Sequence, residues 1–237
     1  MAIQKRHVKK YYFVVLAFVL FAAGAKCVFD NVSSSKHIIN VPYISQEGLA
    51  STGCELVSAA MVLNYYGCSV SVDDVIERTP TSSLVQTQNG LVGDDPSDYF
   101  IGDPYSANGF GCYAPVIVSD MNYFLKKNGT KKAVNLTGTD IDTLISDYVK
   151  KNNPVLIWAT SNMKEPSKGK SWVIKGTGKT FQWILGEHCL VLIGCDNNNY
   201  YFNDPYGSNG VILFDKDLVV KRYISLGKQA VAVENLA

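Results

Sequence analysis

The chain has 237 residues and a nearly balanced charge, with 22 lysines and arginines against 21 acidic residues. This length suffices for one domain with a sizeable core or for two small domains, and the composition is ordinary for a globular protein. Because basic residues are not in excess, the chain lacks the positively charged stripe that holds nucleic acid, and no nucleic-acid partner is expected.

The first 25 residues have the pattern of an export signal. Residues 1–10 carry four basic residues and no acid, residues 11–23 are uncharged and mostly apolar, and Ala23-Gly24-Ala25 has the small-x-small form of a cleavage site. The apolar run is shorter than the about 20 residues of a full membrane span. We interpret residues 1–25 as a signal peptide, with an uncleaved signal anchor as the alternative.

Either form of this N-terminus predicts a location outside the cytoplasm. The protein is then secreted or anchored at the cell surface, and it meets the membrane only through this segment. Removal of residues 1–25 takes away four basic residues and no acid, which leaves 18 lysines and arginines against 21 acids. The mature protein is therefore mildly acidic. Residues 26–37 are expected to form a polar tether, and residues 38–237 a single folded domain.

Helical and strand patterns follow one another in the order of an α+β protein. Apolar residues at helical spacing predict a helix over residues 54–66, and Ser71 with acids after it predicts a capped helix over 71–79. Residues 81–114 show little periodicity, and we interpret them as a long loop that packs its aromatic side chains on the domain. Further helices are predicted at 115–128, 141–151 and from Asp215, and strands at 132–136, 155–159, 171–174, 181–184, 188–195, 200–203, 211–214 and 229–233.

Three residues suggest nucleophilic catalysis by a cysteine. Cys54 stands at the start of the first predicted helix, His188 opens a predicted strand, and Asp204 follows the next strand. A free thiol is mostly protonated at neutral pH, but a helix N-terminus and a nearby imidazolium both stabilise its thiolate. An acid beside the imidazole fixes its orientation and tautomer. The set therefore predicts a thiol nucleophile, its general base and an orienting acid.

The segments around these residues resemble one family of cysteine peptidases. They are Val41-Pro-Tyr-Ile-Ser-Gln46, Thr52-Gly-Cys54-Glu, Ser58-Ala-Ala-Met-Val-Leu-Asn-Tyr-Tyr-Gly67, Glu187-His188-Cys-Leu-Val-Leu-Ile-Gly and Asn203-Asp204-Pro205. Over roughly residues 38–215 the chain is similar to the papain-fold peptidases related to double-glycine leader peptidases (family thirty-nine of the cysteine peptidases). In particular it resembles the stand-alone, exported members of Gram-positive bacteria.

The resemblance implies a papain-like fold, in which N-terminal helices pack on a C-terminal antiparallel sheet. It implies Cys54 as nucleophile, His188 as general base and Asp204 as the orienting residue. Gln46 and the Cys54 backbone N–H would form the oxyanion hole. The implied activity is hydrolysis of a peptide or amide bond, with peptides or cell-wall peptides as substrates. Gln46 lies eight residues before Cys54, which is a longer interval than in classical papain relatives.

Two other functions fit the same residues. A non-catalytic cell-envelope binding module would keep the fold without the activity, and an acyl transferase would pass the acyl group to an amine instead of water. Cys54 by itself could be a buried apolar residue or half of a disulfide, since six cysteines in an exported chain could form three disulfides.

We expect neither a cofactor nor a metal. The chain has no CxxC pair, and the acids between residues 94 and 103 do not have the spacing of a calcium loop. Glu55 and Glu187, which flank the candidate nucleophile and base, are interpreted as structural residues or as direct neighbours of the catalytic set, and not as catalytic residues.

Overall fold

The computed structural model describes residues 36–207 and 210–236 of the chain. The predicted signal segment lies outside the described residues, as does most of the predicted tether. His37 belongs to the main sheet, because strand β1 (His37–Ile38) pairs with β10. Among the helices of the described part, none combines the length and the apolar character needed to cross a membrane.

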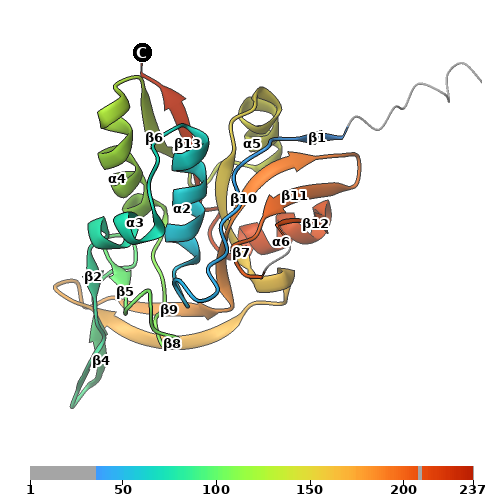
Figure 1. Cartoon of the computed structure of the whole chain (residues 1–237). Coiled ribbons are helices and arrows are strands. Elements are labelled where there is room, and N and C mark those ends of the chain that lie inside the picture. The colour runs from blue at the N-terminus through green and yellow to red at the C-terminus, as the bar shows by residue number, and fades with distance from the viewer. Residues whose placement is uncertain (1–35, 208–209, 237) are drawn as a thin grey trace, which may run out of the picture. The chain divides into compact units, whose positions relative to one another are not determined.

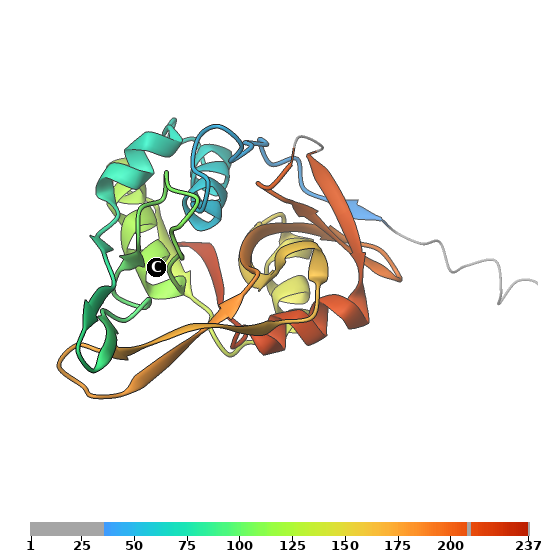
Figure 2. The same cartoon turned by 90° about the horizontal axis from the view of Figure 1, so that it is seen from below.

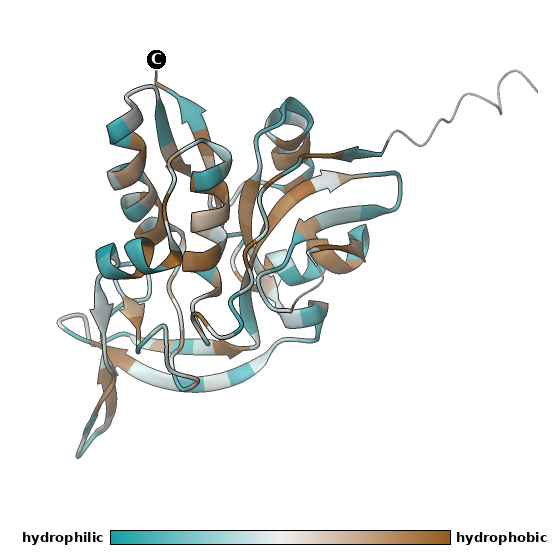
Figure 3. Ribbon diagram, viewed as in Figure 1, coloured by the Kyte–Doolittle hydropathy of each residue, from teal (hydrophilic) through white to brown (hydrophobic). Residues whose placement is uncertain are grey.

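A large antiparallel sheet forms the centre of the domain (Figure 1). Its strands follow the order β12-β11-β10-β7-β13-β6, and the short strand β1 pairs with β10 outside this order. The strands are β6 (Lys131–Asn135), β7 (Val155–Thr160), β10 (Glu187–Cys195), β11 (Asn199–Asn203), β12 (Val211–Asp215) and β13 (Ala230–Asn235). In β7 every residue is buried, and in β10 every residue except Glu187. Such continuous apolar runs are typical of strands that are covered on both faces, and β10 is accordingly brown along most of its length in Figure 3.

Helices cover this sheet. They are α2 (Cys54–Tyr65), α3 (Val72–Arg78), α4 (Ala114–Leu125), α5 (Ile141–Asp147) and α6 (Lys216–Ser225), with short 3₁₀ turns at Lys126–Asn128, Val149–Lys151 and Ser161–Met163. Helix α2 packs on β10 and α4 on β6. All ten residues from Cys54 to Leu63 are buried, so α2 is enclosed on every side. This enclosure holds the first residue of α2 at a fixed place relative to the sheet.

The prediction of a long loop over residues 81–114 is wrong in part. The segment contains the short strands β2 (Thr81–Ser82), β3 (Val85–Thr87), β4 (Gly90–Gly93) and β5 (Phe100–Ile101). Strands β3 and β4 join β8 (Ser167–Ile174) and β9 (Thr180–Leu185) in a separate four-stranded sheet, where β4 pairs in parallel with β8. Figure 2 shows β4 beside the gold hairpin of β8 and β9. The parallel pair joins segments that are distant in the chain, which is why no local pattern announces it.

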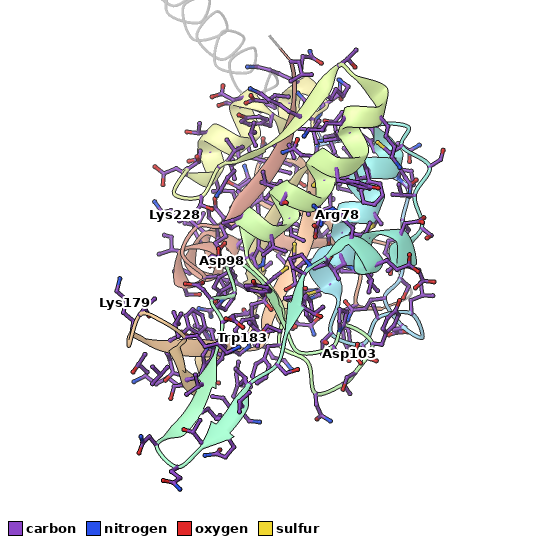
Figure 4. All side chains as sticks on the ribbon, turned by 90° about the vertical axis from the view of Figure 1, so that its left-hand side faces the viewer. Arg78, Asp98, Asp103, Lys179, Trp183 and Lys228 are labelled. Carbon is purple, nitrogen blue, oxygen red and sulfur yellow. The ribbon has the colours of Figure 1, made fainter. Side chains whose placement is uncertain are left out.

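Some aromatic residues of the same segment pack on the domain, as expected, whereas Tyr99 and Tyr105 are exposed. Phe110 meets Trp172 and Trp183 edge to face, at ring-centroid distances of 5.6 and 5.7 Å. Tyr113 stacks on Trp183 at 5.8 Å. These rings form a second, smaller hydrophobic cluster under the β8–β9 hairpin. Figure 4 shows Trp183 on the inner part of that hairpin and Lys179 at its outer tip.

Candidate active site

Cys54 is the first residue of α2, as the sequence predicts. Gly53 precedes it without any side-chain cap. A Cβ at Gly53 would lie 2.8 Å from that of Ala50, so only glycine fits between the preceding turn and the helix. The first N–H groups of a helix have no partner within it and carry its positive dipole end. The thiol therefore lies where an anion is stabilised.

His188 and Asp204 are joined directly. Strand β10 places His188 second in its run, and the β10–β11 hairpin returns the chain so that Asp204 follows β11 at the same end. The His188 Nε2 lies 2.6 Å from Asp204 Oδ1, and both side chains are buried. Asp204 Oδ1 also accepts the Tyr206 N–H at 2.8 Å. Because Nε2 donates its hydrogen bond to the carboxylate, Nδ1 is the ring nitrogen that is left to act as a base.

The sulfur of Cys54 lies against the peptide that links His188 to Cys189. The Cys189 N–H donates to Cys54 Sγ at 3.4 Å, and the Cys54 thiol donates to Glu55 Oε2 at 3.3 Å. In the described part of the chain no hydrogen bond joins Cys54 to the His188 ring, although the catalytic hypothesis anticipates one. The structure thus brings the candidate nucleophile to the backbone next to the candidate base and shows the thiol turned toward Glu55.

Gln46 is brought to the same end of the domain. Its backbone N–H donates to the Pro205 carbonyl at 2.8 Å, directly after Asp204, and its side-chain Nε2 donates to the Ser51 carbonyl at 3.1 Å. The eight residues up to Cys54 are taken up by tight turns, in which Leu49 N–H donates to the Gln46 carbonyl and Gly53 N–H to the Ala50 carbonyl. The long interval is therefore compatible with a position near the nucleophile.

A small cavity adjoins this end of the domain. It has a volume of about 240 Å³ and is lined by Gln46, Glu47, Gly48, Ser51 and Tyr206. Tyr206 is exposed and meets the ring of His188 edge to face at 6.4 Å. The cavity is therefore lined by the candidate oxyanion-hole residue and by a tyrosine whose ring meets that of the candidate base.

Two acids that the sequence analysis interpreted as structural or as direct neighbours of the catalytic set lie at the site. One ligand-type atom each of Cys54, Glu55 and Glu187 falls within 4.8 Å of the others. Burial raises the pKa of Glu55 to about 7 and that of Glu187 well above its ordinary value. Burial, followed by the charges of both acids, also raises the pKa of the Cys54 thiol. The sequence signal for this cluster is the pair of dipeptides Cys54-Glu55 and Glu187-His188.

No second group of this spacing occurs among residues 36–207 and 210–236. In the group of Cys54, Glu55 and Glu187, the sulfur and both Glu55 oxygens already have hydrogen-bond partners within the protein. We therefore interpret the cluster as a pair of carboxyl groups beside a thiol, and the absence of a metal stays a prediction.

Cys54 is not half of a disulfide. The thiols of Cys54, Cys112, Cys189 and Cys195 are all free, so the disulfide interpretation of Cys54 is wrong. Cys189 follows His188 on the same strand and is fully buried. Since successive strand residues point to opposite faces, Cys189 belongs to the core and His188 to the site.

A helix that begins with the cysteine and packs on an antiparallel sheet that carries the histidine and the acid is the architecture of the papain-like cysteine peptidases. The α+β papain-like class is therefore confirmed. The family model described as "Peptidase_C39 like family" matches residues 38–231, and the chain belongs to that family.

The chain is similar to one protein known from its sequence and to two solved structures, among others. The uncharacterized protein YvpB of Bacillus subtilis is 32% identical over 182 residues, which are 77% of this chain and 69% of YvpB. A crystal structure of a candidate C39-like peptidase from Bacillus anthracis superposes with a TM-score of 0.75 and 26% identity, covering 86% of this chain and 99% of the other. The peptidase domain of Streptococcus ComA, a bi-functional ABC transporter, gives a TM-score of 0.46 and 19% identity over 83% of this chain and 98% of its own.

Proposed function

We propose that the protein is an exported thiol hydrolase that cleaves a peptide or amide bond through an acyl-enzyme on Cys54. The observation that carries this proposal is the buried 2.6 Å bond between His188 and Asp204 beside a thiol that heads a helix. The thiol lies 3.4 Å from the backbone nitrogen next to His188. Family and fold support a peptidase-type function.

The chemistry follows from the positions of the donors and acceptors. The Cys54 thiol turns from Glu55 to His188 and gives its proton to Nδ1, while Asp204 holds the ring and stabilises the imidazolium. The thiolate attacks the substrate carbonyl carbon, and the carbonyl electron pair moves onto oxygen. When this intermediate collapses, the C–N bond breaks and the leaving amine takes the proton from His188. Water then attacks the acyl-enzyme with His188 as base and releases Cys54.

The oxyanion needs two donors. The Cys54 backbone N–H is free of the helix ladder, and the Gln46 side-chain NH₂ has a second hydrogen beyond the one given to Ser51. Both are fixed before substrate arrives. Such donors act without reorganisation in a site that excludes water.

The substrate is proposed to be a peptide or a cell-wall peptide, cleaved without a cofactor.

The motivation for an extracytoplasmic location is the order of basic, apolar and small residues within residues 1–25. Mass spectrometry of the exported protein is expected to find a chain that starts at or near Lys26. A full-length chain retained in the membrane would support the anchor instead.

The proposed nucleophile is tested with two matched cysteine variants. Cys54 and Cys189 are both buried, so each change to alanine is expected to cost about 1 kcal/mol of unfolding free energy. Cys54→Ala is expected to abolish peptide hydrolysis and labelling by an active-site-directed thiol reagent, whereas folded Cys189→Ala keeps both. Hydrolysis by Cys54→Ala, or its loss in Cys189→Ala alone, contradicts the assignment.

A binding module that has lost activity is the second candidate, and one observation favours it. The Cys54 thiol is buried and donates to Glu55 rather than to His188. In such a module the thiol stays unreactive toward the reagent in the folded protein and reacts only on unfolding. Labelling of native protein therefore separates the two functions without any knowledge of the substrate.

A further inference from the structure

Two acids, the fully buried Glu55 and the half-buried Glu187, flank the proposed nucleophile and base, and the proposed mechanism gives them no task. Glu55 follows Cys54 on α2, and Glu187 precedes His188 on β10. Because α2 packs on β10, the two carboxyl groups and the Cys54 sulfur meet within 4.8 Å. Two segments that are distant in the chain thus each supply one acid and one member of the proposed catalytic pair.

The contacts of the two acids differ. Glu55 is fully buried; its Oε1 accepts the Cys112 N–H at 2.7 Å, and its Oε2 accepts the Cys54 thiol at 3.3 Å. Glu187 has a buried oxygen, Oε1, without any hydrogen-bond partner. No lysine or arginine contacts either acid in the described part of the chain. A buried carboxylate without a cation is costly, so this arrangement favours protonated forms.

The fold leaves room for this pair at one glycine. A Cβ on Gly111 would lie 2.2 Å from Glu55 Oε1 and 3.2 Å from Glu187 Oε2. The chain therefore passes both carboxyl groups at a distance that only glycine allows. Gly111 also precedes Cys112, whose N–H fixes Glu55. The pair is a built feature of the site and not a chance approach of two surface acids.

We propose, as an extension of the proposed function, that Glu55 and Glu187 are positioning residues that retain a proton between them and hold Cys54 as a thiol. Two carboxylates this close in a buried site cannot both ionise near neutral pH. The charged form of Glu55 accepts the thiol hydrogen and so favours the protonated sulfur. A thiolate beside the pair is opposed by every negative charge that the pair carries.

Other titratable groups also face the pair. They are Cys54 on α2, Cys112 and Tyr113 on the segment before α4, and His188 and Cys189 on β10, with Asp204 behind them. His188 is the one group among these that can become positive. Proton transfer from Cys54 to His188 therefore places a positive imidazolium between the new thiolate and Asp204. Its charge partly offsets the repulsion between the thiolate and the carboxyl pair. The free enzyme keeps its nucleophile protonated until this transfer occurs.

The test measures the ionisation of Cys54 and needs no substrate. The rate of Cys54 alkylation by iodoacetamide is followed from pH 6 to pH 10 by peptide-resolved mass spectrometry, in the folded full chain. Glu55→Gln and Glu187→Gln are each expected to move the midpoint to lower pH by about one unit or more. At pH 7.5 the rate should then rise about tenfold for each unit. The double variant should show the largest shift.

Asp120→Asn is the matched control. Asp120 is also a buried carboxyl with a raised pKa, but it contacts Thr79 and not Cys54, so the alkylation profile should not move. If the glutamine variants fold and alkylate with the wild-type profile, the proposal is overturned. Should Glu55→Gln not fold, Glu187→Gln decides, because it removes a carboxyl whose buried oxygen has no partner.

The two proposals fail separately. If the glutamine variants do not shift the alkylation midpoint while the protein still hydrolyses peptides, the proposed role of the acids is wrong and the proposed hydrolase function is retained. A shifted alkylation profile in a protein that hydrolyses no peptide, with Cys54→Ala indistinguishable from wild type, leaves the acids in control of a thiol that is not a hydrolase nucleophile.

Discussion

At the scale of single residues, the proposed base is held in place by Asp204, whereas the thiol of the proposed nucleophile is directed to Glu55. Asp204 holds His188 through Nε2, and Oδ1 of the same carboxylate is held by the Tyr206 N–H. The Cys54 thiol instead has Glu55 as its acceptor. The proposed mechanism therefore needs the thiol to turn from Glu55 to His188, and the role proposed for the carboxyl pair is to oppose this turn. Catalytic hydrogen bonds are often long or absent before substrate arrives.

Gln46 offers a further residue-scale test. If its side-chain amide stabilises the oxyanion, Gln46→Ala lowers kcat about 10²- to 10³-fold with little change in KM, because the interaction forms only in the transition state. Steady-state kinetics on any peptide that the wild type cleaves measures this split. Glu47→Ala, which changes an exposed neighbour on the same cavity, is the control and should leave kcat unchanged. A rise in KM alone would assign Gln46 to substrate binding.

The positions of the proposed site residues could be predicted because each is tied to a local pattern. Cys54 lies at the first residue of a run with apolar residues at helical spacing, and His188 and Asp204 lie at the ends of neighbouring strands that a short turn connects. The contact between Glu55 and Glu187 could not be predicted in this way. It depends on how α2 packs against β10, and on the space that Gly111 leaves, and neither is written in local sequence.

At the scale of elements, the helices were predicted well where caps mark their ends. Ser71 caps α3 in a complete capping box with Asp74, and Asp215 caps α6 through the Leu218 N–H. The predicted helix over 141–151 is interrupted, because Tyr148 leaves the helical region at φ −121° and a 3₁₀ turn follows α5. Apolar spacing is the same on either side of that break, so periodicity alone does not reveal it.

The strands of residues 81–114 were missed for a different reason. Each has two to four residues, which is too short for an alternation of apolar and polar residues to be visible. Strand β4 pairs with the distant β8 and β2 pairs with β5, whereas β3 and β4 pair with each other across a short turn. What the sequence did show was the aromatic content of the whole segment, from which Phe110 and Tyr113 pack in the small cluster around Trp172 and Trp183.

At the scale of the whole molecule, buried acids determine how stability depends on pH. Glu55 and Asp120 are both fully buried, and burial raises their pKa to about 7 and about 6. Their unfolded values are near 4.3 and 3.9. Between these values the folded protein holds protons that the unfolded chain has lost. Acids with a lowered pKa, such as Asp196 with a pKa of about 2, change the stability only at pH values below this range.

The free energy of unfolding is therefore expected to fall as pH rises from about 4.5 to about 7. The sign follows because unfolding releases protons in this window, so a higher pH favours the unfolded chain. The loss should be on the order of 1–3 kcal/mol, measured as urea midpoints across that range. Glu55→Gln and Asp120→Asn should each flatten the curve, since a neutral amide does not titrate. Asp98→Asn, at an exposed position, is the control and should keep the wild-type slope. If the free energy of unfolding of the wild type instead rises steadily through this pH window, neither buried acid retains its proton in the folded protein.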